Sequence, residues 1–310
     1  MIADSHFILK PQSVFIPSRD GFLLSALLFE PICSKGVVQI SIGTGMKKEF
    51  YQHFAQFIAE QNYTVCLWEY RGMGQSRPND VEVFKKISLQ DWALLDAGGV
   101  LDFLEKRYPD LPKMLIGHSI GGQLLGFMSN HSLLRGAILI TSSTGTWWRH
   151  TFPYRFKSFY FFNILPLLLL PFYGYLACKR FNIMEDLPGN MIREWRKWCN
   201  SENYCFDFLG KTWPKAYFNE IRLPIKSYWV TDDPIANAHT VLAFTRHFSR
   251  ADVLNESVVP ADYGKKQIGH FGLFSRQMRD TFWRKIVNDL DHFATEKVRF
   301  NNPDLRKTNI

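Results

Sequence analysis

The feature that most constrains this chain is a glycine-rich turn between two apolar runs, at residues 114–128. The turn reads Gly117-His118-Ser119-Ile120-Gly121. A strand, a sharp turn and a helix in that order form a nucleophile elbow, which places a serine at the apex. Glycines are needed there because the strand and the helix pass too close for Cβ atoms. The pattern therefore predicts Ser119 as a nucleophile, with a glycine-rich surface turn as the plainer alternative.

Length and charge narrow the class of protein. A chain of 310 residues suits one α/β domain with an insertion. Its hydrophobic content of 46% and charged content of 21% are typical of a folded protein. The formal net charge of +8 is compatible with acidic substrates, with an anionic membrane surface, or only with solubility. No clustered basic tract or nucleic-acid-binding motif accompanies it, so no nucleic acid is expected as a partner.

The cysteines and the N-terminus carry little functional signal. The five cysteines are Cys33, Cys66, Cys178, Cys199 and Cys205. Their odd number and the lack of CxxC spacing predict neither a disulfide framework nor a metal site, and no motif indicates a cofactor. The first residues show no basic start followed by a long apolar stretch, so no signal peptide is predicted. The default expectation is a reducing, cytoplasmic setting.

Apolar periodicity predicts alternating strands and helices. Strands are expected at 13–17, 22–30, 36–42, 64–68, 114–116, 136–140, 225–230 and 251–259, and helices at 49–61, 89–107, 123–128 and 275–293. The first two strands form an antiparallel hairpin at a sheet edge, and the helix at 49–61 turns Phe50, Phe54, Phe57 and Ile58 to one face. Short connections favour an α/β fold with a mostly parallel sheet covered on both faces. Ligands bind at the carboxyl ends of such strands, where Thr44 and Ser119 fall.

The alternation breaks between residues 144 and 214, which predicts an inserted, hydrophobic, helical cap between two parts of the core, 1–143 and 215–310. The run at 159–172 approaches the length of a membrane span. Two prolines interrupt it, and a span would place the two parts of one sheet on opposite sides of the bilayer. A cap over the active site is favoured over a lipid-contacting patch or an oligomer contact. Basic residues keep peripheral membrane contact open: Arg155, Lys157, Lys179 and Arg180.

Several motifs in one order carry a resemblance to a known family. They are Gly43-Thr44-Gly45, residues 69–76 (EYRGMGQS), Gly117-His118-Ser119-Ile120-Gly121-Gly122, Asp232-Asp233-Pro234 and Gly269-His270-Phe271. The chain resembles the α/β-hydrolase superfamily over almost its whole length outside the insertion. Within that superfamily it looks most like the predicted hydrolases related to serine aminopeptidases and monoacylglycerol-lipase-like enzymes.

The resemblance implies a catalytic triad. Ser119 would be the nucleophile, His270 the general base, and an aspartate after the strand at 225–230 would orient the histidine. A serine hydroxyl needs an imidazole to take its proton, and a buried carboxylate fixes the tautomer of that imidazole. The superfamily's spacing favours Asp233 as the acid, with Asp232 as the alternative and Asp262 as a distant third. The plainer interpretation of Asp232-Asp233-Pro234 is a helix-capping turn.

The same resemblance implies an oxyanion hole made by the backbone N–H groups of Ile120 and Thr44. Ile42 stands where the superfamily more often has a histidine, which puts a close transfer of substrate preference in doubt. His118 is expected to pack rather than to catalyse. Arg71 is expected to brace the loop that carries Gly72 and Gly74.

These features predict a serine hydrolase of the carboxylic-ester hydrolase type, which forms an acyl-serine on Ser119. The apolar insertion predicts a small hydrophobic substrate, an ester or thioester of an acyl group. An amide or peptide hydrolase or an acyltransferase would use the same residues. A non-catalytic binding protein on this fold, or a membrane-anchored interaction protein that uses the leucine-rich insertion, is the alternative from another class. The sequence leaves the oligomeric state open.

Overall fold

A single eight-stranded sheet organises the computed structural model, which describes residues 9–213 and 215–295. The strands are β1 (Gln12–Pro17), β2 (Leu23–Phe29), β3 (Val37–Ser41), β4 (Thr64–Trp68), β5 (Lys113–His118), β6 (Leu134–Ile140), β7 (Pro224–Val230) and β8 (Asp252–Val258). Their order across the sheet is β1-β2-β4-β3-β5-β6-β7-β8. The β1–β2 and β2–β4 pairs are antiparallel and all later pairs are parallel. The predicted edge hairpin and mostly parallel sheet are confirmed.

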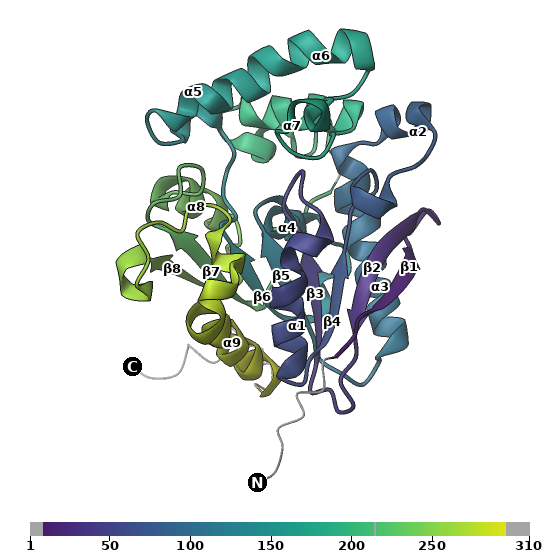
Figure 1. Cartoon of the computed structure of the whole chain (residues 1–310), viewed down its shortest axis with the longest axis vertical. Helices are drawn as coiled ribbons and strands as arrows, with labels where there is room; N and C mark the ends of the chain where they lie inside the picture. The colour runs from purple at the N-terminus through teal and green to yellow at the C-terminus, as the bar shows by residue number, and fades with distance from the viewer. Residues whose placement is uncertain (1–8, 214, 296–310) are drawn as a thin grey trace, which may run out of the picture.

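Helices cover both faces of this sheet, as Figure 1 shows, with α1 and α9 in front of the strands and α3 behind them. The helices are α1 (Gln52–Glu60), α2 (Val81–Lys86), α3 (Ala97–Arg107), α4 (Ile120–Gln123), α5 (Tyr154–Phe159), α6 (Leu165–Tyr173), α7 (Gly189–Cys199), α8 (Ala238–Thr245) and α9 (Arg284–Thr295). Because the central strands β3, β4 and β5 lie between two helical layers, every one of their residues is buried. This explains why apolar residues dominate their sequences.

Three predicted helices differ in detail from the structure. The segment expected at 89–107 begins with the wider π turn Asp91–Asp96 and continues as α3. The segment expected at 275–293 contains the 3-10 turn Arg276–Met278 and the π turn Arg279–Trp283 before α9. The helix after Ser119 starts earlier than predicted, at Ile120, and tightens to a 3-10 turn at Leu124–Phe127.

The inward placement of Phe50 is wrong. Phe54, Phe57 and Ile58 are buried as expected, whereas Phe50 is 40% exposed. Phe50 belongs to the 3-10 turn Lys48–Tyr51 that precedes α1, where side chains repeat every three residues. The helical period used for the prediction therefore does not apply to it, and its neighbour Tyr51 is the buried residue.

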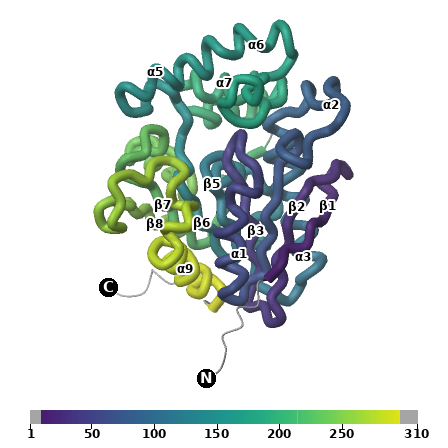
Figure 2. Tube along the Cα trace, viewed as in Figure 1, coloured from purple at the N-terminus to yellow at the C-terminus, as the bar shows by residue number. Residues whose placement is uncertain are grey.

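Between β6 and β7 the chain forms the helices α5, α6 and α7, which Figures 1 and 2 show above the carboxyl ends of the strands. The π turn Tyr160–Ile164 joins α5 to α6, so that residues 154–173 form one nearly continuous helix. Helix α7 lies between that helix and the core in both views. By length and composition the helix Tyr154–Tyr173 could cross a membrane, and 28% of its most apolar window is buried within the protein.

Candidate active site

Ser119 occupies a strained turn between β5 and α4. Its backbone angles are φ 53° and ψ −117°, a region that residues other than glycine rarely adopt. The strand β5 ends at His118 and α4 starts at Ile120, so one residue makes the entire reversal. The N–H of Ser119 donates to the carbonyl of Ile140 at 2.9 Å, which ties the turn to the end of β6. Such strain is typical of functional turns.

Two glycines are required by close backbone contacts at this turn. A Cβ atom on Gly117 would lie 2.4 Å from the Cα of Gly122. A Cβ atom on Gly121 would lie 2.1 Å from the carbonyl oxygen of Ser41, at the end of β3. Both contacts are with backbone, which cannot move aside as a flexible side chain can. The steric reason given for the glycines in the sequence therefore holds in the structure.

Asp233 and His270 form a buried pair. The Nδ1 atom of His270 lies 2.7 Å from Oδ2 of Asp233, and both side chains are almost fully buried. The other oxygen of Asp233 accepts the N–H groups of Ile235 at 2.8 Å and Ala236 at 3.1 Å. Burial acts to raise the pKa of Asp233, but the charge and hydrogen bond of His270 and these two N–H groups lower it below its ordinary value. The carboxylate is therefore ionised at neutral pH.

The neighbouring carboxylate makes different contacts. Asp232 accepts the N–H of Ile268 at 3.0 Å and the N–H of Gly269 at 2.8 Å, so it holds the loop that carries His270. Gly269 has a φ of 63° in that loop. Asp262 is exposed on the 3-10 turn Pro260–Tyr263. Of the three candidate acids, Asp233 is the one that the structure brings to His270.

The backbone of His270 lies beside the elbow. Its carbonyl oxygen accepts hydrogen bonds from Nε2 of His118 at 3.1 Å and from Oγ1 of Thr141 at 3.4 Å. His118 precedes Ser119, and Thr141 follows the residue that binds the N–H of Ser119. Within the described residues no hydrogen bond joins Oγ of Ser119 to the imidazole of His270. Such bonds are often long without substrate and tighten when it binds.

A chain of hydrogen bonds with a defined direction connects two loops of the site through Tyr51 and His118. The N–H of Gly43 donates to the Tyr51 hydroxyl at 3.0 Å, and this hydroxyl lies 2.6 Å from Nδ1 of His118. Burial, followed by the charge of His270, lowers the pKa of His118 to about 3, so the imidazole is neutral. Its single proton then lies on Nε2 and is donated to the carbonyl of His270.

This chain extends what the sequence predicted. His118 packs in the core as expected and also joins the loop after β3 to the loop that carries His270. Tyr51 was not predicted as a site residue, although it stands in the segment that follows Gly43-Thr44-Gly45. A buried tyrosine at the start of a helix is a common core residue, so only the contacts of its hydroxyl reveal the connection.

The two candidate oxyanion donors lie at the ends of adjacent strands. Ile120 is the first residue of α4, so its N–H has no acceptor inside the helix. The register pairs Ser41 of β3 with Gly117 of β5, and Thr44 and Ser119 follow these residues by three and two positions. The loop that contains Thr44 is anchored by Lys48, whose Nζ lies 2.8 Å from Oε2 of the buried Glu69.

Arg71 braces the loop that follows β4, as predicted. Its guanidinium binds the buried carboxylate of Asp96 and the carboxylate of Asp20, in each case at 2.7 Å. Its backbone N–H donates to Asp96 at 3.0 Å, and its carbonyl accepts Nε1 of Trp92 at 2.9 Å. All groups of Arg71 are thus used within the fold, and its role is structural.

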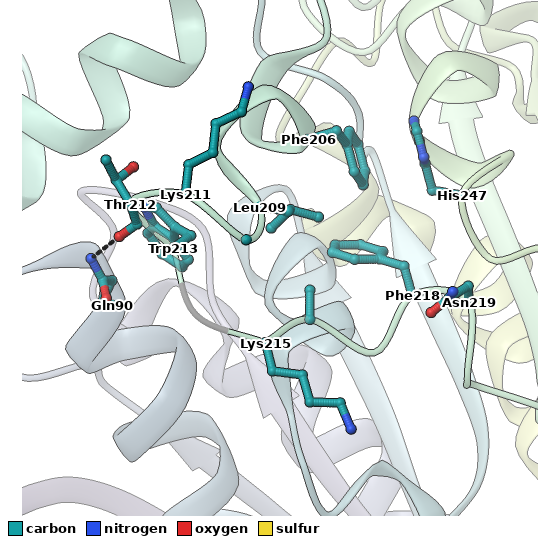
Figure 3. A pocket seen from close by; sticks show the side chains of 12 residues that line it. Gln90, Phe206, Leu209, Lys211, Thr212, Trp213, Lys215, Phe218, Asn219 and His247 are labelled. Carbon is teal, nitrogen blue, oxygen red and sulfur yellow. Dashed lines mark hydrogen bonds between the residues drawn. The ribbon is translucent and has the colours of Figure 1, made fainter.

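A pocket of about 800 Å³ opens where the insertion returns to the core, and Figure 3 shows it from close by. A dashed line there marks the hydrogen bond from the Gln90 amide to the carbonyl of Thr212. The lining residues are Gln90, Phe206, Leu209, Gly210, Lys211, Thr212, Trp213, Lys215, Ala216, Phe218, Asn219 and His247. None of the residues predicted for the triad or the oxyanion hole lines this pocket, so it does not define the reacting centre.

Comparisons with known proteins point to the same fold. Residues 33–171 match the family model described as serine aminopeptidase, S33. Human monoglyceride lipase is 28% identical over 126 residues, which cover 37% of this chain. The match spans 39% of the length of that lipase.

Solved structures resemble the chain over nearly its whole length. A thermostable carboxyl esterase from Bacillus coagulans superposes with a TM-score of 0.60 at 16% identity, covering 92% of this chain and 99% of the esterase. A lipase in an open form gives 0.59 at 16% identity, covering 92% and 100%. An esterase from Pyrococcus furiosus gives 0.57 at 15% identity, covering 92% and 90%. At these identities the likeness shows the fold.

The sheet order, the elbow and these likenesses together show an α/β-hydrolase fold. In sequence the chain resembles the serine aminopeptidase family over residues 33–171 and human monoglyceride lipase over 126 residues. The fold expected from the sequence is confirmed.

Proposed function

We propose that this chain is a serine hydrolase that forms an acyl-serine intermediate on Ser119 and cleaves an ester or thioester of a hydrophobic acyl group. The observation that carries the proposal is the buried 2.7 Å contact between His270 and the ionised Asp233, beside a serine in a strained turn. A binding protein has no need of a buried imidazole–carboxylate pair at this point, because burying both groups costs free energy.

The proposed reaction has two halves. Nε2 of His270 takes the proton of Ser119 as Oγ attacks the substrate carbonyl, and Asp233 stabilises the resulting imidazolium through Nδ1. The N–H groups of Ile120 and Thr44 donate to the oxygen that becomes negative. His270 then gives its proton to the leaving alcohol or thiol as the carbon–oxygen or carbon–sulfur bond breaks. In the second half water attacks the acyl-serine with the same base and releases the acid.

The substrate class follows from the insertion and from the similar proteins. The helices of residues 144–214 lie above the carboxyl ends of the strands, and we propose that they act as a cap over the site. Their apolar composition suits an acyl chain, and the similar proteins named as esterases and lipases support an ester over an amide. Any membrane contact is proposed to be peripheral and to involve the cap, in a cytoplasmic setting.

Labelling with a fluorophosphonate probe tests the activated serine. Wild type should label rapidly, whereas Ser119→Ala and His270→Ala should lose labelling. His239→Ala is the matched control, because His239 is exposed on α8, and it should label like wild type. Labelling that persists in Ser119→Ala would exclude Ser119 as the nucleophile. A well-folded wild type that does not label would favour the non-catalytic binding protein.

Matched substrates then test the bond that is cleaved. p-Nitrophenyl esters of increasing acyl length, a thioester and a p-nitroanilide of the same acyl group should be compared. We expect turnover of the ester and thioester to rise with chain length and to exceed that of the anilide. Preferential cleavage of the anilide would support the amide hydrolase, and transfer of the acyl group to an added alcohol in preference to water would support the acyltransferase.

A further inference from the structure

We propose that the outer side of the helix at residues 154–173, with Phe152 before it, is a docking surface for an anionic lipid bilayer. This outer apolar face consists of Phe152, Phe156, Phe159, Tyr160, Leu167, Leu168 and Phe172. The exposed fractions of these side chains run from 39% for Phe159 to 84% for Phe172. Monomeric proteins rarely expose a contiguous apolar surface of this kind without an interaction to cover it.

The packing of the helix explains why this side is free. Ser158, Phe162, Leu165 and Leu169 recur at intervals of four, three and four residues, and all of them are buried. This inner stripe faces α7, where the ring of Phe162 lies 4.9 Å from that of Trp195. Figures 1 and 2 place α5 and α6 at the end of the molecule farthest from the sheet, beyond α7. The helix is thus apolar on both sides. Only the inner side packs against the rest of the protein, and the outer side stays exposed.

The basic residues around the outer apolar face favour an anionic partner. Residues 141–184 contain no aspartate or glutamate, but they contain five basic residues: Arg149, Arg155, Lys157, Lys179 and Arg180. The guanidinium of Arg155 lies 5.6 Å from the ring centres of both Phe152 and Phe156. Arg155, Lys157 and Arg180 form no salt bridge with a described residue. Basic side chains beside exposed aromatic and leucine residues are typical of helices that lie in the headgroup region of a membrane.

The same charges argue against a second copy of the chain as the occupant. In a symmetric dimer the outer apolar face would meet itself, so that Arg155, Lys157 and Arg180 of one copy would approach the same residues of the other. Like charges brought together at an interface disfavour association. Anionic headgroups would instead neutralise them while the acyl region receives the phenylalanine and leucine side chains.

The arrangement favours a helix that lies along the surface over one that crosses the bilayer. The inner stripe is buried against α7, and both ends of the insertion lead back to neighbouring strands, β6 and β7. Crossing would pull the inner stripe away from α7 and separate these strands. Docking through the outer apolar face leaves every described contact of the core in place and turns the cap toward the source of acyl substrates.

Co-sedimentation with vesicles tests the proposal directly. We expect the full chain to pellet with vesicles of equimolar phosphatidylcholine and phosphatidylglycerol and to remain in solution with phosphatidylcholine alone. Raising the ionic strength from roughly 0.05 M to 0.5 M should weaken the binding, because salt screens the basic side chains. The variant Leu168→Gln/Phe172→Gln should weaken it by about tenfold or more, since it removes two apolar side chains from the lipid.

Matched variants separate this surface from general effects. Ile32→Gln changes a side chain that is 99% exposed outside the insertion, and it should bind like wild type. Arg155→Gln/Lys157→Gln should weaken binding to the anionic vesicles by about tenfold, because each lost positive charge lowers the affinity several-fold. Arg222→Gln/Arg250→Gln removes two exposed charges just before β7 and β8, at the amino ends of the strands, and should have little effect.

The outcomes that overturn the proposal are distinct from those that overturn the catalytic one. Equal pelleting of wild type and Leu168→Gln/Phe172→Gln would exclude the outer apolar face as the docking surface. A wild-type dimer in solution that Leu168→Gln/Phe172→Gln dissociates, together with no vesicle binding, would assign the face to a second copy. Ser119→Ala should pellet like wild type, so vesicle binding is measured independently of the chemistry.

Discussion

Among the residues of the site, Tyr51 carries the hydroxyl on which the connection between Gly43 and His270 depends. The carbonyl of His270 can only accept, so the single proton of the neutral His118 imidazole lies on Nε2. Nδ1 of that imidazole therefore accepts the Tyr51 proton, while the Tyr51 oxygen accepts the N–H of Gly43. One phenol therefore joins two loops that the proposed reaction needs.

Tyr51→Phe should lower turnover without leaving a cavity in the core. The variant keeps the ring and its edge contact with Phe274, 4.8 Å between ring centres, but leaves the Gly43 N–H and His118 Nδ1 unpaired. Because small displacements of reacting groups cost up to about a hundredfold in rate, we expect a ten- to hundredfold fall in kcat on a p-nitrophenyl ester with little change in KM. Tyr63→Phe, which removes a buried hydroxyl bonded to Asp291, is the control and should leave kcat unchanged. Equal kcat values for wild type and Tyr51→Phe would exclude the positioning role.

Asp233 and Asp232 provide a matched pair of substitutions. Asp233→Asn removes the carboxylate that orients His270, so kcat should fall by up to about 10⁴-fold. Asp232→Asn keeps one oxygen that can accept from the loop before His270, and its kcat should fall by no more than about tenfold. Initial rates on one ester measure both variants. A larger loss in Asp232→Asn than in Asp233→Asn would assign the acid to Asp232.

The ionisation of Asp233 also predicts how stability depends on pH. Its pKa in the folded protein lies below the ordinary value of 3.8, so at acid pH the unfolded chain binds a proton there more readily than the folded one. The stabilisation is therefore complete above about pH 5 and is lost as the pH falls through 3.8 toward the lower, folded pKa. The difference in melting temperature between wild type and Asp233→Asn should shrink as the pH is lowered from about 6 to 3. A constant difference would show that the carboxylate charge is not the source of the effect.

At the scale of elements, the elbow depends on how closely β3, β5 and α4 approach one another. The carbonyl of Ser41 at the end of β3 occupies the space where a side chain on Gly121 would lie. The start of α4 is thereby held against two adjacent strands, and the N–H of its first residue points away from the helix. The short helix contributes little by itself, since four residues form a single turn. Strand packing is what holds the turn in its strained conformation.

Gly121→Ala should therefore destabilise the protein and disrupt the elbow. The added methyl group would meet backbone, so we expect a loss of about 1–3 kcal/mol in the free energy of unfolding. Gly272→Ala is the control, because its nearest neighbour is the side chain of Ile268 at 3.1 Å, which can move. Urea denaturation measures the two variants. An unchanged midpoint for Gly121→Ala would contradict the close approach of α4 to β3.

At the scale of the whole molecule, the insertion is connected to the core through Tyr204. Its hydroxyl accepts Nε1 of Trp195 at 3.0 Å and donates to Oε1 of Gln123, the last residue of α4, at 2.9 Å. The amide of Gln123 in turn donates to the carbonyl of Ser143 at 2.7 Å. Helix α7 of the insertion is thus joined by hydrogen bonds to the helix that follows Ser119.

Tyr204→Phe should loosen this connection. The substitution leaves the Trp195 N–H and the Gln123 carbonyl without their partner, which costs about 1–3 kcal/mol for each group that stays buried. The free energy of unfolding in urea should fall by that order. Tyr160→Phe, a change on an exposed ring, should stay within about 0.5 kcal/mol of wild type. Equal stability of the two variants would show that the contact does not hold the cap.

Much of the molecule could be predicted from local sequence signals. Strand β4 occupies the predicted residues 64–68, and the elbow follows from two glycines that flank a serine. Local signals failed where the helical period changes, as at Phe50 in a 3-10 turn and in the π turn at Asp91–Asp96. A pattern based on 3.6 residues per turn cannot register a local change of pitch.

The sequence by itself determined the order of the elements and the position of Ser119, because apolar periodicity and the steric needs of a tight turn are local properties. Only the tertiary structure decided that Asp233, and not its neighbour, contacts His270, and that Tyr51 joins the two loops. It also decided which side of the helix at 154–173 faces α7. Adjacent aspartates, a buried tyrosine and a helix that is apolar all round look alike in a sequence, and their contacts come from segments far away in the chain.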